Sequence, residues 1–360
     1  MRVCMLNDNF YRGSGVTLVI QRILSMPGFR DMDVYLAGSE TLNGRKSVQE
    51  NTGMVATGHY RHFALMKSGP QLLPALYRFG RWVRETGIDV IHSHHRRLAV
   101  LAHLIRPWTR VPVLYTGHLT FPDASWFRQL APPIVTGVSP SVVEYLKRCT
   151  KASEVILIYN PVDFGVPRET VRGPRPLRAV SVGRLDPEKG YDMLIDAWSK
   201  LKQQGFDAQL DIFGEGSLRS SLEKQITERN LVGKVRLCGF VSDLSERLPS
   251  YAFNVLVSQK EGFPNAVVEA AAHAIPTLLT NVAGSRDTLP PNLSLPNGLA
   301  YGDGDALSKA LSQWFHSPEM VSSDGKRFYD YLKSFCSPDV VEQRYLNAYH
   351  RVLVKTGTQR

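Results

Sequence analysis

The chain has 360 residues, a formal net charge of +10 and a hydrophobic content of 43%. This length is too great for one ordinary core and predicts two domains, each able to bury a substantial core. The charge is uneven, because residues 1–165 contain 19 Lys and Arg against 11 Asp and Glu, whereas the remainder contains 24 against 22. The first part should therefore present a positive surface, which suits anionic lipid, nucleic acid or phosphorylated substrates.

Cysteine usage and hydropathy exclude several classes of protein. Cys4, Cys149, Cys238 and Cys336 show no short metal-ligand spacing and lie in or beside apolar stretches, so we interpret them as reduced packing residues. The N-terminus turns polar at Asn7, which leaves too short an apolar run for a signal peptide, and no other segment approaches membrane-spanning length. We therefore expect a cytoplasmic protein that is neither exported nor integral to a membrane.

Short β-branched runs alternate with longer helix-like stretches along the first half. The predicted strands are 2–6, 33–37, 89–92, 111–115 and 134–138, and the predicted helices include 17–25 and 70–85. This alternation is typical of a parallel α/β sheet.

The second half repeats the alternation. Its predicted strands are 177–182, 209–213, 235–237, 254–257 and 276–279, and its predicted helices are 192–204, 217–229 and 266–273. A stretch rich in proline, glycine and charge, 164–176, is interpreted as the interdomain linker. We predict two Rossmann-like domains, 1–165 and 166–337, facing across a cleft, with ligands beyond the carboxyl ends of the strands.

Two acidic residues, Glu261 and Glu269, flank a glycine-proline loop that leads into a predicted helix. Glu269 should lie about one turn into that helix, where a carboxylate gains from the helix dipole and can accept bonds from vicinal hydroxyls. The backbone N–H groups of 263–266 would remain available for phosphate. The pair therefore suits a ligand with many hydroxyls, although two solvated glutamates beside a loop would have the same spacing.

Two cations, Arg184 and Lys189, lie on a predicted loop between a strand and the helix that begins near Tyr191. An arginine can bridge phosphate oxygens with two bonds and a lysine adds a point charge, so together they could neutralise a departing diphosphate without metal. The alternative is that both merely pair with Asp186 and Glu188 on the surface. Their place at the exit of a strand favours function.

Glycine turns follow other predicted strands. Gly214 and Gly216 lie in one, Gly13 and Gly15 in another that lacks dinucleotide or Walker spacing, and Gly284 in a further one. Such turns let the backbone approach a ligand or simply turn tightly. Each alone is weak evidence, and their recurrence at strand exits carries more weight.

Together these segments resemble the retaining, nucleotide-sugar-dependent glycosyltransferases of family 4, which have the GT-B fold. The resemblance runs through most of the chain and rests on Gly13-Ser14-Gly15, His92-Ser93-His94, Gly117-His118, Asn160-Pro161-Val162-Asp163, Gly183-Arg184-Leu185 to Lys189-Gly190, Phe213-Gly214-Glu215-Gly216, Gly239-Phe240-Val241 and the stretch 261–269. It implies that the C-terminal segment 338–360 is a helix that crosses back to the N-terminal domain.

The resemblance also implies a role for each matching residue. Arg184 and Lys189 would bind the donor diphosphate, Glu269 the ribose hydroxyls and Glu261 the transferred sugar. The remaining implied contacts are Gly15 and Gly214 at backbone turns, His118 near the reacting face of the sugar, Phe240 and Val241 at the base, and Phe263, Pro264, Asn265 and Ala266 through their backbone.

A retaining transfer needs no enzyme nucleophile, and the N-terminal half supplies no convincing carboxylate pair for one. We therefore expect front-face substitution, in which the leaving diphosphate accepts the proton of the acceptor hydroxyl.

The D-x-D sequences at Asp31 to Asp33 and Asp303 to Asp305 are interpreted as structural, the second as a helix cap. No cofactor and no essential metal are expected, and a metal role for His92 and His94 is disfavoured because a third ligand is not evident.

Basic residues interleave with aromatic ones in the N-terminal half. The predicted helix 70–86 places Leu73, Leu76, Tyr77, Gly80 and Val83 toward one side and Arg78, Arg81 and Arg84 on another, with Trp82 near the basic face. Trp108 and Trp126 lie among other basic residues. Such a surface could bind anionic headgroups at the inner face of the cell membrane, where a lipid-linked or lipopolysaccharide-type acceptor would be met.

An epimerase of the same fold, or a basic nucleic-acid-binding or membrane-binding protein, remains the alternative, although no nucleic-acid recognition motif is found. UDP is favoured as the carrier only by its frequency in the family.

Overall fold

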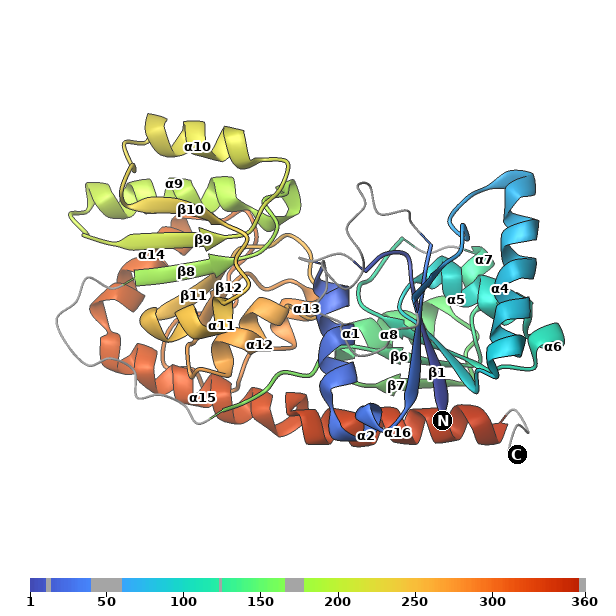
Figure 1. The fold of residues 1–360 in the computed structure, drawn as a ribbon. Helices are drawn as coiled ribbons and strands as arrows, with labels where there is room; N and C mark the ends of the chain where they lie inside the picture. The colour runs from blue at the N-terminus through green and yellow to red at the C-terminus, as the bar shows by residue number, and fades with distance from the viewer. Residues whose placement is uncertain (11–13, 40–59, 123–124, 166–177, 356–360) are drawn as a thin grey trace. The chain divides into compact units, whose positions relative to one another are not determined.

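The protein is described here by a computed structural model that covers residues 1–10, 14–39, 60–122, 125–165 and 178–355. The chain folds into two compact units (Figure 1). Unit 1 is Met1–Pro161 with Pro338–Arg360, and unit 2 is Val162–Ser337.

Unit 1 is built on a seven-stranded parallel sheet with the order β3-β2-β1-β4-β5-β6-β7. The strands are β1 Arg2–Asn7, β2 Asp33–Gly38, β3 Tyr60–His62, β4 Val90–Ser93, β5 Val113–Gly117, β6 Ile134–Gly137 and β7 Glu154–Leu157. The five strands predicted in this half are confirmed. The sequence missed β3 and β7, which form the two edges and are only partly buried, so their hydrophobic signal is weak.

Helices cover both faces of this sheet. The helices are α1 Gly15–Ser25, α2 Pro27–Arg30, α4 Leu72–Thr86 after the short turn η1 Gly69–Gln71, α5 Arg96–Leu104, α6 Arg106–Thr109, α7 Ser125–Leu130, α8 Pro140–Cys149 and α16 Pro338–Lys355. α1, α2 and α16 share one core with the strands, and α4 and α5 share the core on the other face. The last helix buries Val341, Tyr345 and Tyr349 there, so the predicted return of the chain's end to the first unit is observed.

Unit 2 has a five-stranded parallel sheet with the order β10-β9-β8-β11-β12. Its strands, all predicted from the sequence, are β8 Arg178–Val182, β9 Gln209–Phe213, β10 Val235–Gly239, β11 Phe253–Leu256 and β12 Thr277–Leu279. Because every strand runs the same way, all five strand-exit loops lie along one edge of the sheet.

The helices of unit 2 also form two layers. They are α9 Tyr191–Gln203, α10 Arg219–Glu228, α11 Leu244–Arg247, α12 Asn265–Ala271, α13 Ala283–Arg286, α14 Gly304–His316 and α15 Pro318–Cys336, with the short turns η2 Pro187–Lys189 and η3 Leu248–Ser250. α9, α10 and α14 pack on one face of the sheet, and α12 with η3 packs on the other. α10 begins at Arg219, two residues later than predicted, and the N–H of its N-cap residue Leu218 is bonded to the carbonyl of Leu185.

Residues 162–165, which the sequence assigned to the first domain, pack within unit 2. The N–H of Val162 donates to Cys336 O at 3.0 Å, and the ring of Phe164 contacts that of Tyr329 at 5.5 Å. The hydroxyl of Tyr329 donates to Gly165 O at 2.7 Å. The rest of the predicted linker, 166–176, lies outside the described residues.

None of the four cysteines forms a disulfide. Cys4, Cys149 and Cys336 are buried, as expected for packing residues, whereas Cys238 is exposed. The interpretation of Cys238 as a packing residue was therefore wrong. Its strand, β10, is at the edge of the sheet, so one side of the strand lacks a covering neighbour.

Candidate functional site

The five strand-exit loops of unit 2 are joined to one another by backbone hydrogen bonds. Gly214 N–H donates to Gly239 O at 2.9 Å, and Gly183 N–H donates to Phe213 O at 3.0 Å. On the other side, Gln259 N–H donates to Glu188 O at 2.8 Å, and Gly284 N–H donates to Glu261 O at 3.3 Å. These bonds follow the order of the strands, so the loops form one continuous rim.

Two glycines permit this close packing. Gly214 has a φ of +143°, and a side chain there would place its Cβ 1.9 Å from Gly183 O. Gly190 has a φ of +65°, and its Cβ would lie 2.4 Å from Val257 O. Both positions therefore need glycine for its backbone conformation and for space. In the structure, the backbone of Gly214 lies close to Gly183 in the neighbouring loop.

Arg184 binds carboxylates of its own loop. Its guanidinium donates to Asp186 and, at 2.8 Å, to Glu188. This is the pairing that the sequence offered as the structural alternative. Burial opposes the ionisation of Asp186, but hydrogen bonds from Ser217 and the charge of Arg184 outweigh burial and lower the pKa of this carboxyl group. Arg184 is 55% exposed at its side chain, so a solvent-borne anion can reach it.

Lys189 behaves differently, because its partner comes from another loop. Its Nζ donates to Glu261 Oε1 at 2.5 Å across 72 residues of sequence, and both side chains are largely buried, at 18% and 9% exposure. Beneath them lies the buried phenol of Tyr191, whose pKa is raised by burial and further by the charge of Glu261. The structure thus brings together Lys189, the residue predicted to bind the diphosphate, and Glu261, the residue predicted to bind the sugar.

The helix α12 follows the loop that carries Glu261. Pro264 is its N-cap, Asn265 and Ala266 form its first turn, and Phe263 is buried at 5% exposure. Glu269 is partly buried and is the fifth residue of the helix, so its predicted place about one turn in is confirmed.

Phe240 and Val241 follow β10 directly. Phe240 is 48% exposed, while Val241 packs against the core between the sheet and α12. A base laid on this loop would meet an exposed aromatic ring, which is compatible with the role implied for it.

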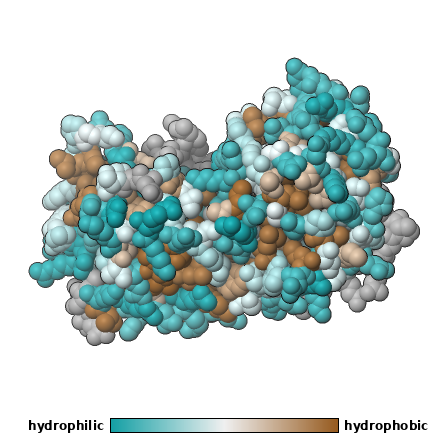
Figure 2. Space-filling model, turned by 180° about the vertical axis from the view of Figure 1, so that it is seen from behind, coloured by the Kyte–Doolittle hydropathy of each residue, from teal (hydrophilic) through white to brown (hydrophobic). Residues whose placement is uncertain are grey.

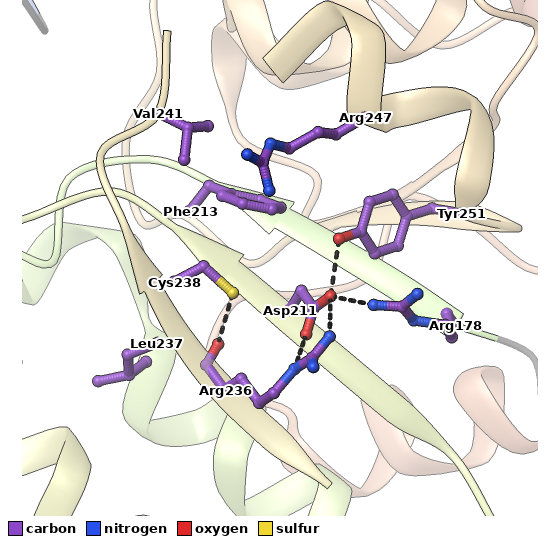
Figure 3. A pocket seen from close by; sticks show the side chains of 9 residues that line it. All are labelled: Arg178, Asp211, Phe213, Arg236, Leu237, Cys238, Val241, Arg247 and Tyr251. Atoms are coloured by element: carbon purple, nitrogen blue, oxygen red, sulfur yellow. Dashed lines mark hydrogen bonds and ion pairs between the residues drawn. The ribbon is translucent and has the colours of Figure 1, made fainter. Parts of the chain in front are cut away.

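A pocket of about 390 Å³ lies on the face of the sheet beside β9 and β10 (Figure 3). It is lined by Arg178, Asp211, Phe213, Arg236, Leu237, Cys238, Val241, Arg247 and Tyr251. Among the predicted site residues it includes only Val241. Arg184, Lys189, Glu261 and Glu269 do not line it, so the pocket is a feature of the sheet face and not the rim of loops.

The floor of this pocket is a hydrogen-bond network around Asp211, which is 2% exposed. Its carboxylate accepts bonds from Arg178 at 2.6 Å and from Arg236 and Tyr251 at 2.7 Å. Burial opposes ionisation of Asp211, but the bonds from Arg236 and Tyr251 outweigh burial and lower its pKa. The carboxylate thereby fixes three side chains that come from β8, from β10 and from the segment before β11 (Figure 3).

The predicted residues of unit 1 lie at the carboxyl edge of its sheet. Gly15 is exposed as the first residue of α1, whose N-cap Ser14 accepts a bond from Thr17 N–H. His118 directly follows β5, and its Nε2 lies 2.9 Å from Nδ1 of His94, which follows β4. Gly13 lies outside the described residues.

Three histidines at this edge are neutral at physiological pH. Burial lowers the pKa of His92 to about 3, with the charge of His118 adding to the shift. Burial also lowers the pKa of His118 to about 4, and burial with the two neighbouring imidazoles lowers that of His94 well below its ordinary value. The sequence singled out all three residues but gave no sign that His94 contacts His118.

No metal centre emerges from the described part of the chain, since it holds no group of three or more His, Cys, Asp or Glu arranged as ligands. Asp303 caps α14 by accepting the N–H of Ala306 at 2.9 Å, as predicted. Asp33 opens β2, and its carboxylate lies 3.5 Å from Arg2. Both D-x-D sequences therefore have structural roles.

The face of α4 that is buried differs from the predicted one. Ala75, Phe79 and Val83 face the core, whereas Leu73 is 72% exposed and Tyr77 is 58% exposed. The predicted apolar side is thus correct only in part, since Gly80 and Val83 of that side are buried. Trp82 was also misplaced, since it packs among Phe63 and Phe79 instead of lying at the surface.

An exposed aromatic and basic surface remains on α4 and α6, which we call the α4 patch. Tyr77 stacks on Trp108 at 5.5 Å, and Arg84 lies 6.0 Å from the ring of Trp108. Arg78 and Arg81 are exposed on the same helix.

Figure 2 shows another view of the surface, in which apolar side chains form small groups between hydrophilic ones. Throughout the described residues, no helix has the length and apolar character needed to cross a bilayer.

Comparisons with known proteins match both halves of the chain. "Glycosyltransferase Family 4" matches residues 15–166 and "Glycosyl transferases group 1" matches residues 167–329. A lipopolysaccharide 1,6-galactosyltransferase of Salmonella typhimurium is 25% identical over 289 residues, which are 72% of this chain and 77% of that protein. An uncharacterised glycosyltransferase of Methanocaldococcus jannaschii is 27% identical over 180 residues. These residues are 48% of this chain, and the match spans less than half of the relative's own length, 44%.

The fold has close counterparts among solved structures. The HepE protein of Anabaena, solved in complex with UDP, is similar with a TM-score of 0.81 at 16% identity, over 98% of this chain and 100% of that one. The two units with their parallel sheets are those of the GT-B fold. With both family matches in succession, the chain belongs to the family 4 glycosyltransferases and is a glycosyltransferase.

Replacing Asp211 with alanine is expected to destabilise the protein by about 3 kcal/mol, because it leaves two arginines without their buried carboxylate. The value lies at the low end for a broken buried pair, since the side chains of Arg178 and Arg236 are 33% and 53% exposed. The free energy of unfolding from urea denaturation measures it. The control Asp243→Ala, which removes the exposed partner of Arg247, should leave the midpoint unchanged, and equal midpoints for both variants would contradict the prediction.

Proposed function

We propose that this glycosyltransferase moves a sugar from a nucleoside diphosphate donor, with UDP as the favoured carrier, to a hydroxyl of a lipid-linked or cell-surface glycan. The observation that carries the proposal is the contact between Lys189 and Glu261 at the rim of unit 2. In a sugar nucleotide the transferred sugar is joined directly to the diphosphate. A cation for the phosphate and an acceptor for sugar hydroxyls must therefore lie side by side, as these two do.

The rest of the donor would extend along the same rim. Arg184 supplies a second cation that is exposed to solvent, and Glu269 supplies a carboxylate one turn into α12 for the ribose hydroxyls. Phe240 offers a ring beside Val241 for the base. The UDP complex of the Anabaena protein supports a uridine carrier, although the fold alone is shared at this level of identity.

Binding of the donor would require exchange of partners. Arg184 gives up carboxylates of its own loop for phosphate oxygens, which offer the same two-bond geometry and more charge. Lys189 can contact a phosphate while it keeps Glu261 within reach, since an ammonium has three donors. The two carboxylates near Arg184 hold it in place when the donor is absent.

The proposed reaction retains the anomeric configuration by front-face substitution. The acceptor hydroxyl attacks C1 on the face that the diphosphate leaves, the bond from C1 to the phosphate oxygen breaks, and the proton passes to the leaving diphosphate. Arg184 and Lys189 stabilise the charge that grows on the leaving group. No enzyme nucleophile and no metal ion take part.

For the acceptor we propose a glycan of the lipopolysaccharide or lipid-linked class. The support is the galactosyltransferase of Salmonella typhimurium, which acts on lipopolysaccharide by its name and aligns with most of this chain. A relative from Campylobacter jejuni, 37% identical over 109 residues, is named for an acceptor linked to diphospho-undecaprenol. Both names describe acceptors carried on anionic lipids.

UDP and UDP-sugars are expected to raise the thermal midpoint of the purified full chain, because a ligand that binds only the folded state stabilises it. At 100 times the dissociation constant the gain is about 2.7 kcal/mol. A thermal-shift panel of UDP, GDP, ADP and their glucose derivatives measures it. AMP and inorganic phosphate serve as controls, and a panel in which no nucleotide diphosphate shifts the midpoint would sink the proposed donor site.

Arg184→Ala and Lys189→Ala should each lower kcat by on the order of 10²-fold, the loss usual for a single electrostatic donor. Steady-state transfer assays measure the effect, with unfolding curves to show that each variant is folded. Arg229→Ala removes an exposed cation paired with Asp196 and should retain wild-type turnover. Full activity in the double variant Arg184→Ala with Lys189→Ala would refute the roles of both cations.

Transfer in the presence of excess EDTA should proceed at the rate seen without it, because the two cations take the place of a metal at the diphosphate. NMR of the product should show the anomeric configuration of the donor. Loss of activity that Mg²⁺ or Mn²⁺ restores would overturn the metal-free reaction. An inverted product would overturn front-face substitution.

The α4 patch is proposed to hold the protein peripherally on the inner face of the cell membrane. Exposed Tyr77 and Trp108 would enter the headgroup region while the neighbouring arginines bind lipid phosphates. The protein should therefore sediment with anionic vesicles at low salt, and Arg78→Glu with Arg84→Glu should abolish sedimentation. A matched pair of reversals in unit 2, Arg229→Glu and Lys234→Glu, should not, and equal sedimentation of both double variants would contradict the proposal.

A further inference from the structure

A chain of hydrogen bonds beside the candidate site fixes the proton positions of His92. The hydroxyl of Thr136 donates to Tyr115 O, so it accepts from Thr116, whose oxygen lies 2.7 Å away. With its proton so used, Thr116 accepts from Nε2 of His92 at 2.7 Å. Nδ1 of His92 then accepts from the hydroxyl of Tyr349 at 2.8 Å. Every donor in this chain has an acceptor, and His92 is the Nε2–H tautomer.

The same reasoning applies to His94 and His118. Both rings are neutral, so a bond of 2.9 Å between Nδ1 of His94 and Nε2 of His118 places one proton on one of these two atoms. Nε2 of His94 is buried against the ring of His92 and has no hydrogen-bond partner among the described residues. A buried N–H without an acceptor is rarer and costlier than a lone pair without a donor. The proton of His94 therefore belongs on Nδ1.

That assignment determines the state of the neighbouring ring. If Nδ1–H of His94 donates, Nε2 of His118 is an acceptor, and the single proton of the neutral His118 ring must lie on Nδ1. Nδ1 of His118 has no hydrogen bond within the described residues and is not among the buried unpaired atoms. It is therefore the part of the ring that an incoming ligand can meet.

We propose that His94 is a positioning residue, whose Nδ1–H bond holds His118 in the Nδ1–H tautomer so that this N–H can donate to a hydroxyl oxygen of a sugar bound at the carboxyl edge of the unit 1 sheet. The first half of this statement concerns the protein alone, and only the role of the sugar rests on the proposed function. His118 is then a neutral hydrogen-bond donor in the reaction. It does not act as a base, because its only lone pair is occupied by His94.

The packing of the two rings supports this role. His94 is 5% exposed, and its ring lies 5.2 Å from that of His118 with 26° between the planes, so His118 cannot turn over without breaking the contact. Burial lowers the pKa of His118 to about 4, so the ring stays uncharged and keeps a single N–H. A donor of fixed direction costs less ordering on binding than one that must select its tautomer.

The tautomers can be read directly by NMR. The full chain is labelled with ¹⁵N-histidine, and long-range ¹H–¹⁵N correlation spectra are assigned with the variants His92→Gln, His94→Asn and His118→Phe. Nε2–H is expected on His92, and Nδ1–H on both His94 and His118. An Nε2–H on His118 overturns the proposal, whatever the enzyme's substrate.

Kinetics test whether His94 acts through His118. His94→Leu removes the donor at similar volume and should lower kcat at least 10-fold with little change in the donor KM. His94→Asn places an amide N–H where Nδ1 lies and should restore kcat to within about 3-fold of wild type. In the His118→Phe background, His94→Leu should cost nothing further, because the two residues act as a unit.

The control variant His103→Leu replaces another partly buried histidine of unit 1 and should keep wild-type kcat. Equal losses for His94→Leu and His94→Asn, or additive losses in the double variant, would show a merely structural role. Failure of UDP-sugars to bind the wild-type protein would remove the proposed function but leave the NMR result standing. The two failures are thus distinguishable.

Discussion

The structure of the candidate site depends on one constraint, the continuous bonding of five loops along the carboxyl edge of a parallel sheet. No loop in this rim is independent, because each exchanges a backbone hydrogen bond with the next in strand order. Gly190, Gly214, Gly216 and Gly284 are points where the approach is too close for any side chain. Residues distant in sequence, such as Lys189 and Glu261, are therefore held at fixed separation before any ligand arrives, which is the pre-organisation that transition-state stabilisation requires.

The loops at the carboxyl edges of the two sheets differ in their electrostatic character. Unit 2 offers charges, with Arg184 and Lys189 compensated by carboxylates that a diphosphate can replace or share. The carboxyl edge of unit 1 offers neutral imidazoles, kept uncharged by burial. In the proposed reaction the charges of unit 2 would stabilise the leaving group, because charge-assisted hydrogen bonds to phosphate are strong.

The Asp211 network and the α4 patch differ in how far their polar groups bond to one another. On the sheet face beside β10, a buried carboxylate gathers Arg178, Arg236 and Tyr251 into a satisfied polar floor. On α4, exposed aromatic rings stack with one another beside arginines and have no such closed network. The first is an internally compensated structure, whereas the second leaves apolar area for a partner surface.

The sequence by itself determined the alternation of strands and helices, all five strands of unit 2, the place of Glu269 in α12 and the cap at Asp303, because these follow from local periodicity and capping chemistry. It failed at β3 and β7, which are edge strands with little burial, and at the buried face of α4, where Ala75 and not Leu73 faces the core. Only the tertiary structure decided the partners: Lys189 with Glu261, Arg184 with its own loop, and His94 with His118. Each side chain had several candidates of suitable charge or hydrogen-bonding capacity, and distance between loops, which no local pattern encodes, selected among them.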